Sequence, residues 1–265
     1  MQRRLRSELE LRIARPAELV LSIAVHDRDA CAQERLEVLE EERPLRPREL
    51  RDPLGARLHA LSAGPGRVRI RYEATVEGRT EPDPADEAQL VTFLRPSRYC
   101  ESDALAATAG DLFGGLRGFE LLDAVEDWVA SRLVYDPASS LPSDGARDTL
   151  LKRRGVCRDY AHLLVALLRA RDVPARFVSV YAPGLEPMDF HAVVEAHVEG
   201  RWWLVDATRM APRSGMVRIA GGRDASDTAF LSNSLSGVRL ERLAVDAGCD
   251  EPLAVEEPGE RVQLG

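Results

Sequence analysis

The sequence predicts an α+β protein, in which an N-terminal antiparallel β domain precedes a core of helices packed on an antiparallel sheet. Three observations predict this class. Apolar residues alternate with polar ones up to about Leu94, recur every three or four residues from Phe119 to Leu133, and alternate again from Ala175. We expect a β-sandwich-like domain at residues 1–95, a second domain at 96–235, and a tail at 236–265 whose structure the pattern leaves unclear.

The β domain is predicted by short alternating runs with turn-forming residues between them. The runs cover residues 9–13, 19–25, 36–39 and 68–76, and the turns include Gly64-Pro65-Gly66. The acidic, proline-containing stretch at 81–87 is expected to form a loop of this domain. The boundary to the second domain is expected near Pro96.

Three helices and three strands are predicted after this boundary. The helices are expected at residues 119–133, 147–153 and 157–171, with Gly155 as a left-handed cap just past the second. The strands are expected at residues 175–181, 192–198 and 202–205, the last two joined across Gly200. Gly221-Gly222-Arg223 lacks the pattern of a phosphate-binding loop and is interpreted as a hairpin.

Composition narrows the class of partner. A formal net charge of -8 repels phosphate backbones, so no nucleic-acid partner is expected. The longest apolar segment near the N-terminus, Leu19 to Val25, is too short for a signal peptide or a membrane span, which predicts a cytoplasmic protein without a membrane partner. Four cysteines without CxxC spacing indicate neither disulfides nor a cysteine-built zinc site.

One cysteine has the sequence context of a nucleophile. Cys157 follows Gly155-Val156 and opens the helix predicted at 157–171. Free N–H groups and the positive end of the helix dipole favour a thiolate there, and the same N–H groups can bind the oxyanion of a tetrahedral intermediate. A small buried residue that packs a helix end gives the same local pattern, and for an arbitrary cysteine that explanation is the commoner one.

Two downstream residues favour the catalytic interpretation. His191 begins the β run HAVVEAHVEG, and Asp206 ends the run WWLVDAT. A cysteine, a histidine and an acid that folding brings together form the arrangement used for acyl transfer. His191 would accept the thiol proton, and Asp206 would hold the histidine tautomer and stabilise the imidazolium.

These segments resemble three blocks of the bacterial transglutaminase-like superfamily. The blocks are GVCRDYA at 155–161, HAVVEA at 191–196 and WLVDAT at 203–208, and the segment LRPSRY at 94–99 and the β-rich region before it are similar to the connecting segment and β domain of many members. The resemblance covers roughly residues 1–210. It implies a papain-like core, with Cys157, His191 and Asp206 in the triad positions. Two positions depart from the commoner pattern: Ala207 stands in place of a proline, and Val193 in place of a frequent tryptophan.

Strand geometry alone places Asp206 poorly for this role. A tight hairpin at Gly200-Arg201 would set Asp206 opposite Glu195, about 13 Å from His191 at ~3.4 Å per residue. A bulge, strand twist or offset loop would have to close that gap. The assignment of Asp206 therefore depends on the resemblance more than on register.

The remaining candidates are interpreted as structural. His162 and His197 lack a usual zinc spacing relative to Cys157 and are expected to pack or to lie at the surface, so neither a metal nor another cofactor is expected. Arg158 and Asp159 are expected to pair with neighbouring charges. At most one of Trp202 and Trp203 can face an acyl pocket, because adjacent strand residues point to opposite faces. Trp128 is expected in a helix core, and Cys31, Cys100 and Cys249 are expected to be non-catalytic.

The leading hypothesis is cysteine-dependent acyl transfer from a peptide or protein amide through a thioester on Cys157. Water as the acceptor would make the protein a peptidase or amidase, and a lysine amine would make it a cross-linking enzyme. We favour hydrolysis, because cross-linking requires a specialised second pocket. The alternative is a non-catalytic peptide-binding module that keeps the same fold, and the sequence leaves the oligomeric state open.

Overall fold

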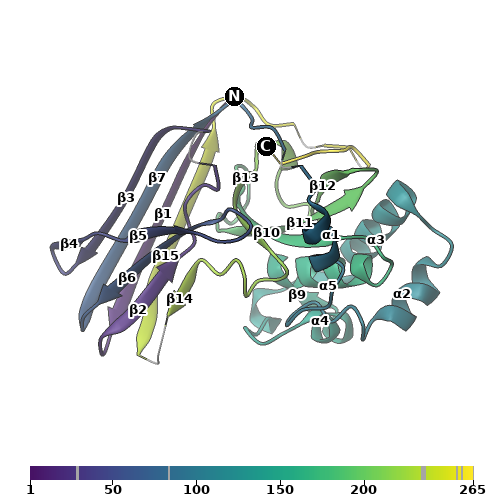
Figure 1. Cartoon of the computed structure of the whole chain (residues 1–265), viewed down its shortest axis with the longest axis horizontal. Helices are drawn as coiled ribbons and strands as arrows, with labels where there is room; N and C mark the ends of the chain where they lie inside the picture. The colour runs from purple at the N-terminus through teal and green to yellow at the C-terminus, as the bar shows by residue number, and fades with distance from the viewer. Residues whose placement is uncertain (28–29, 83, 234–236, 255, 258, 265) are drawn as a thin grey trace.

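The molecule consists of a β-sandwich, a third sheet beside it, and a layer of helices on the far face of that sheet (Figure 1). The computed structural model describes all residues except 28–29, 83, 234–236, 255, 258 and 265. The α+β class with antiparallel sheets is confirmed. Within the described residues, none of the helices combines the length and the apolar character that crossing a lipid bilayer requires.

The sandwich is built from two antiparallel sheets. The larger has the order β15 (Val238–Cys249), β1 (Gln2–Ile13), β7 (Gly66–Glu77), β3 (Cys31–Glu40) and β4 (Arg43–Leu45). The smaller has the order β14 (Leu231–Asn233), β2 (Ala17–Leu21), β6 (Arg57–Ala63) and β5 (Arg48–Arg51). Every second residue of β1 is buried, so the period-two pattern in the sequence corresponds to one face of a sheet that packs on another.

The C-terminal tail, whose structure the sequence pattern leaves unclear, contains a long strand. β15 pairs with β1 from Arg3↔Cys249 to Ile13↔Val238 and so completes the larger sheet of the sandwich. Farther along the tail, Val262 bridges to Leu204 and covers the outer edge of the third sheet. These partners lie more than 50 residues away in sequence, so no local periodicity identifies them.

The third sheet has the order β12 (Arg201–Val205), β11 (His191–Val198), β10 (Ala175–Tyr181) and β13 (Val217–Gly222). The helices are α1 (Glu87–Thr92), α2 (Ala106–Phe113), α3 (Gly118–Arg132), α4 (Ala146–Lys152) and α5 (Cys157–Arg169). Short elements complete the list: the parallel pair β8 (Val134–Tyr135) and β9 (Arg154–Gly155), and the 3₁₀ turns η2 (Pro137–Ser139) and η3 (Arg213–Gly215).

Helix α5 lies at the centre of this half of the molecule. Its residues from Asp159 to Arg169 are all buried, between α3 and α4 on one side and the sheet on the other. The three helices expected from the sequence pattern are found within two residues of α3, α4 and α5. The cap prediction for Gly155 is wrong, because Arg153 takes the left-handed conformation (φ 53°) after α4 and Gly155 lies in β9.

The sandwich packs directly on the third sheet. Tyr181 of β10 donates a hydrogen bond to the Ile23 carbonyl at 2.8 Å, and its hydroxyl also lies 3.0 Å from Ser7 Oγ. Val217 and Ile219 of β13 join the apolar core of the sandwich. The two halves therefore share a core, and the sandwich can contribute side chains to a cleft in the other half.

The Arg169 guanidinium is a buried tie between α5, β10 and the segments that follow α1 and β13. It is 3% exposed and donates to the carbonyls of Ala175 (2.8 and 3.0 Å), Arg95 (3.0 Å) and Arg223 (2.7 Å). Arg169→Ala removes these buried hydrogen bonds, although the Arg223 carbonyl still accepts from Ser97 Oγ at 3.3 Å, so we expect a loss of about 3–5 kcal/mol in the free energy of unfolding, measured by urea titration. Arg132→Ala, at an exposed site in the last turn of α3, is the matched control and should change it by less than about 0.5 kcal/mol.

Candidate active site

The segment before α5 presents Cys157 at the first position of the helix. Asp159 Oδ2 accepts the Val156 N–H at 2.9 Å, which stabilises the turn into the helix. A Cβ atom at Gly155 would lie 2.5 Å from Asp159 Oδ2, so this turn requires glycine for close approach rather than for a left-handed cap. Gly155 and Asp159 are thus structural residues that position Cys157, whose side chain remains partly exposed.

His191 and Asp206 are in direct contact. His191 Nε2 lies 2.8 Å from Asp206 Oδ2, and both side chains are almost completely buried. The other carboxylate oxygen, Oδ1, accepts hydrogen bonds from the Thr208 backbone N–H (2.9 Å) and hydroxyl (2.7 Å). Asp206 is therefore oriented by Thr208 and in turn orients the imidazole of His191.

The expected separation of about 13 Å between Asp206 and His191 is wrong. The hairpin turns at Glu199 (φ 51°) and Gly200 (φ 81°), a pair of positive φ angles typical of a type I′ turn. The turn therefore lies one residue earlier in the chain than assumed. Val205 consequently pairs with Val194, and Asp206 comes opposite a position on β11 that is two residues closer to His191. The chain leaves the strand after Val205, and the Asp206 carboxylate reaches the ring.

Burial and neighbouring charges have opposite effects on the pKa values of His191 and Asp206. Burial lowers the pKa of His191, but the charge and hydrogen bond of Asp206, together with the Cys157 thiol, outweigh it and raise that pKa. Burial likewise raises the pKa of Asp206, but His191 and the two donors of Thr208 outweigh it and hold that pKa below its usual value. The pair therefore favours an imidazolium beside a carboxylate.

The Cys157 thiol is a further neighbour of the imidazole. Because Asp206 occupies Nε2, the other ring nitrogen, Nδ1, is left for the thiol, and Nδ1 is buried without a hydrogen bond of ordinary geometry. The thiol is still close enough to contribute to the raised pKa of His191. In enzymes without substrate such hydrogen bonds are often long, so the unmade hydrogen bond at Nδ1 is compatible with proton transfer from the thiol.

Tyr135 is a neighbour of the thiol that the sequence does not reveal. It lies on β8, and the parallel pairing of Tyr135 with Gly155 brings it beside Cys157. Burial raises the pKa of the Tyr135 phenol to about 12, and the thiol and backbone N–H of Cys157 also act on it by hydrogen bonding. A phenol beside that N–H group lies near the position an oxyanion would occupy.

Cys157 and His191 line a cleft of about 440 Å³ between the sandwich and the core. The core supplies mostly apolar walls, among them Phe177, Phe190 and Ile219. The sandwich supplies Leu231 of β14 and Leu243 of β15, so a strand from the chain's C-terminal part closes one side. A cleft of this size and composition fits part of a peptide chain.

The other candidates from the sequence do not enter this arrangement. His162 is fully buried against Tyr99, accepts the Ala225 N–H at 3.2 Å, and has its pKa lowered to about 3 by burial. It is therefore a neutral packing residue. Trp202 and Trp203 are absent from the cleft walls and contact Phe93 and Phe119 respectively, so neither forms an acyl pocket. Within the described part of the chain, no group of three or more potential metal ligands comes together.

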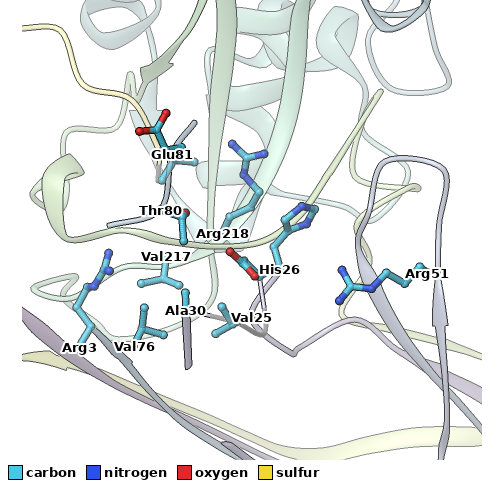
Figure 2. A pocket seen from close by; sticks show the side chains of 12 residues that line it. Arg3, Val25, His26, Ala30, Arg51, Val76, Thr80, Glu81, Val217 and Arg218 are labelled. Atoms are coloured by element: carbon cyan, nitrogen blue, oxygen red, sulfur yellow. The ribbon is translucent and has the colours of Figure 1, made fainter. Parts of the chain in front are cut away.

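A second cavity lies where the sandwich meets β13 (Figure 2). It has a volume of about 180 Å³, and Arg3, His26 and Arg218 contribute to its polar lining. Among the described residues, no cysteine lines it, and it shares no lining residue with the cleft that contains Cys157 and His191. The cleft that contains Cys157 is therefore the candidate active site.

The fold is of a cysteine-enzyme type, and comparison with known proteins identifies the family. Residues 108–207 match the model of the transglutaminase-like superfamily. The chain is also similar to a crystal structure of a proposed cysteine protease from Cytophaga hutchinsonii, with 31% identity, a TM-score of 0.87, and coverage of 97% of this chain and 94% of that one. The chain belongs to the transglutaminase-like superfamily.

Curated relatives come from mycobacteria. An uncharacterized protein of Mycobacterium leprae is 35% identical over 157 residues, which are 54% of this chain and 55% of the relative. An uncharacterized protein of Mycobacterium tuberculosis is 40% identical over 163 residues, with 49% and 52% covered. The chain thus spans about half the length of the curated relatives it matches.

Proposed function

We propose that the protein is a cysteine hydrolase that cleaves peptide-like amides through a thioester on Cys157. The observation that carries the proposal is the buried contact of 2.8 Å between Asp206 and His191, because His191 lines the cleft that contains the Cys157 thiol. A histidine held by a carboxylate and adjacent to a thiol at a helix start is the arrangement that activates a sulfur nucleophile.

The proposed reaction has two halves. His191 takes the thiol proton, and the sulfur forms a bond to the amide carbon while the carbonyl oxygen gains charge near the Cys157 N–H. His191 then gives its proton to the leaving nitrogen as the C–N bond breaks, which leaves the thioester. Water, deprotonated by His191, attacks the thioester, and the acid and the free thiol are released.

The acceptor in the second half decides between hydrolysis and cross-linking. An amine in place of water would give a new amide, and the three residues serve both reactions equally. We propose water, because an amine acceptor needs a second binding site in addition to the cleft for the acyl group.

The activation of the thiol can be tested before any substrate is known. We expect iodoacetamide to label Cys157 at pH 6 at least about tenfold faster in the wild type than in His191→Ala, because a thiol without a cationic partner is almost wholly protonated at that pH. Mass spectrometry of the Cys157 peptide measures the rate. His197→Ala, at a histidine outside the cleft, is the control and should label like the wild type. Equal rates for the wild type and His191→Ala would contradict the pairing of thiol and imidazole.

A further inference from the structure

Asp189 places a carboxylate in the candidate cleft, two residues before His191. It lies in the loop between β10 and β11 and lines the cleft together with Cys157 and His191. The residue is open to solvent, so a ligand in the cleft can reach it. The mechanism proposed above uses Cys157, His191 and Asp206 and assigns no task to Asp189.

The Asp189 carboxylate forms no ion pair with an arginine or lysine among the described residues, and its cationic neighbour is the His191 imidazole. Its Oδ1 accepts the N–H of the adjacent Phe190 at 2.7 Å. Arg158 lines the same cleft, but its guanidinium donates to Asp159 (2.9 Å), Ser140 Oγ (3.0 Å) and the Leu141 carbonyl (2.6 Å). Apart from its electrostatic interaction with His191, the Asp189 carboxylate is thus available to a cation of a bound ligand.

The surroundings of Asp189 make this carboxylate sensitive to a ligand cation. Partial burial raises its pKa, which shows that the cleft penalises the negative charge. The neighbouring walls include the rings of Phe190 and Phe230, which stack on each other with centroids 5.4 Å apart. Its charge also acts on His191 and Tyr135, so Asp189 is near the reacting atoms. A cation placed there would gain a partner and offset that penalty.

We propose that Asp189 makes the cleft selective for peptide substrates with a primary-amine cation, such as a lysine side chain, next to the amide that is cleaved. This inference rests on the proposed function, since it names the substrate class of the same site. The apolar walls would contact the aliphatic stem of such a side chain, and Asp189 would bind its ammonium group.

Charged thiol reagents test the selectivity at Cys157 without a substrate. The probes are 2-aminoethyl methanethiosulfonate, which carries a primary ammonium, and the uncharged methyl methanethiosulfonate, and mass spectrometry follows the Cys157 peptide. We expect the ratio of the ammonium rate to the methyl rate to fall about 5- to 10-fold in Asp189→Asn. A ratio is compared because removal of a negative charge can change the thiolate fraction for both reagents alike.

Glu186→Gln is the matched control. It removes one negative charge from the same loop, at an exposed residue that does not line the cleft, and should leave the ratio within about twofold of the wild type. A ratio for Asp189→Asn equal to that of the wild type overturns the proposal. So does an equal fall in Glu186→Gln, because it would indicate a general field and not a site.

Failure of the selectivity proposed for Asp189 can be distinguished from failure of the proposed function. The labelling ratio depends on the charge in the cleft and not on turnover, whereas the proposed function fails if no peptide yields a cysteine-dependent product. Where the wild type does cleave peptides, matched substrates with lysine or norleucine beside the scissile amide give a second measurement. Asp189→Asn should then lower the lysine preference in kcat/KM about 5- to 10-fold, and an unchanged preference overturns the proposal.

Discussion

Cys157→Ala is expected to reduce kcat/KM, on any amide that the wild-type protein cleaves, by roughly four to six orders of magnitude. The thiol is the group that forms the thioester, and no neighbouring side chain can replace it. A phenol is already protonated at neutral pH at its ordinary pKa of about 10, and burial makes Tyr135 still harder to ionise because it raises that pKa to about 12. Release of product from a library of peptide amides, followed by mass spectrometry, measures the loss.

The control for this substitution is Cys249→Ala. Cys249 is also a free, partly exposed cysteine, but it lies at the end of β15 and outside the cleft. It should retain the full activity of the wild type, which would show that the effect belongs to one thiol. Turnover that survives in Cys157→Ala would contradict the thioester mechanism. Peptide binding by the wild type without any cysteine-dependent product would instead favour the alternative of a non-catalytic binding module.

Asp206→Asn is expected to lower kcat about 10⁴-fold, with a smaller effect on KM. The amide can donate to His191 Nε2 and so favour the tautomer whose Nδ1 carries the proton, which prevents Nδ1 from accepting the thiol proton. The substitution also removes the charge that stabilises the imidazolium at 2.8 Å. Single-turnover and steady-state kinetics on the same amide separate the effect on chemistry from the effect on binding.

Asp206→Asn is also expected to change the pH dependence of activity, in a direction that follows from the pKa of His191. Asp206 raises that pKa, so the imidazolium that protonates the leaving amine persists above the ordinary histidine value of about 6.5. The activity of the wild type should therefore decline only at a pH above that value, and the alkaline limb of Asp206→Asn should move to lower pH. Asp144→Asn removes a buried carboxylate paired with Lys152 at 2.7 Å, outside the cleft, and should leave the limb in place. An alkaline limb that does not move in Asp206→Asn would show that Asp206 does not set the charge of His191.

The helical half of the fold is the part that the sequence predicts best. Helices and strands there have long, regular apolar periods, and α3, α5 and β10 begin and end within two residues of the expected positions. The sequence pattern also predicts that the N-terminal part consists of antiparallel strands. The division into domains and the cytoplasmic location stay predictions.

In the candidate site, contacts between neighbouring residues can be predicted from the sequence, and contacts between distant segments cannot. The context of Cys157 is local, since the turn, Gly155 and Asp159 lie within a few residues. The distance between Asp206 and His191 depends on a hairpin register that is shifted by a turn at Glu199-Gly200, and a one-position error in the turn moves the paired residue by two. No sequence pattern indicates Tyr135, because only the short pairing of β8 with β9 brings it beside the Cys157 thiol.

The amino-acid sequence by itself determined the class of fold and the order of α3, α4, α5, β10, β11 and β12, because periodicity is a property of neighbouring residues. It also indicated the three residues proposed for chemistry, Asp206 through the family resemblance, whereas α1, α2 and β13 were not predicted. Only the tertiary structure decided that Asp206 touches His191, that β15 returns to complete the sandwich, and that Asp189, without an arginine or lysine partner among the described residues, lines a cleft closed by both halves. These facts depend on contacts between segments far apart in the chain, and such contacts are set by how whole surfaces pack together.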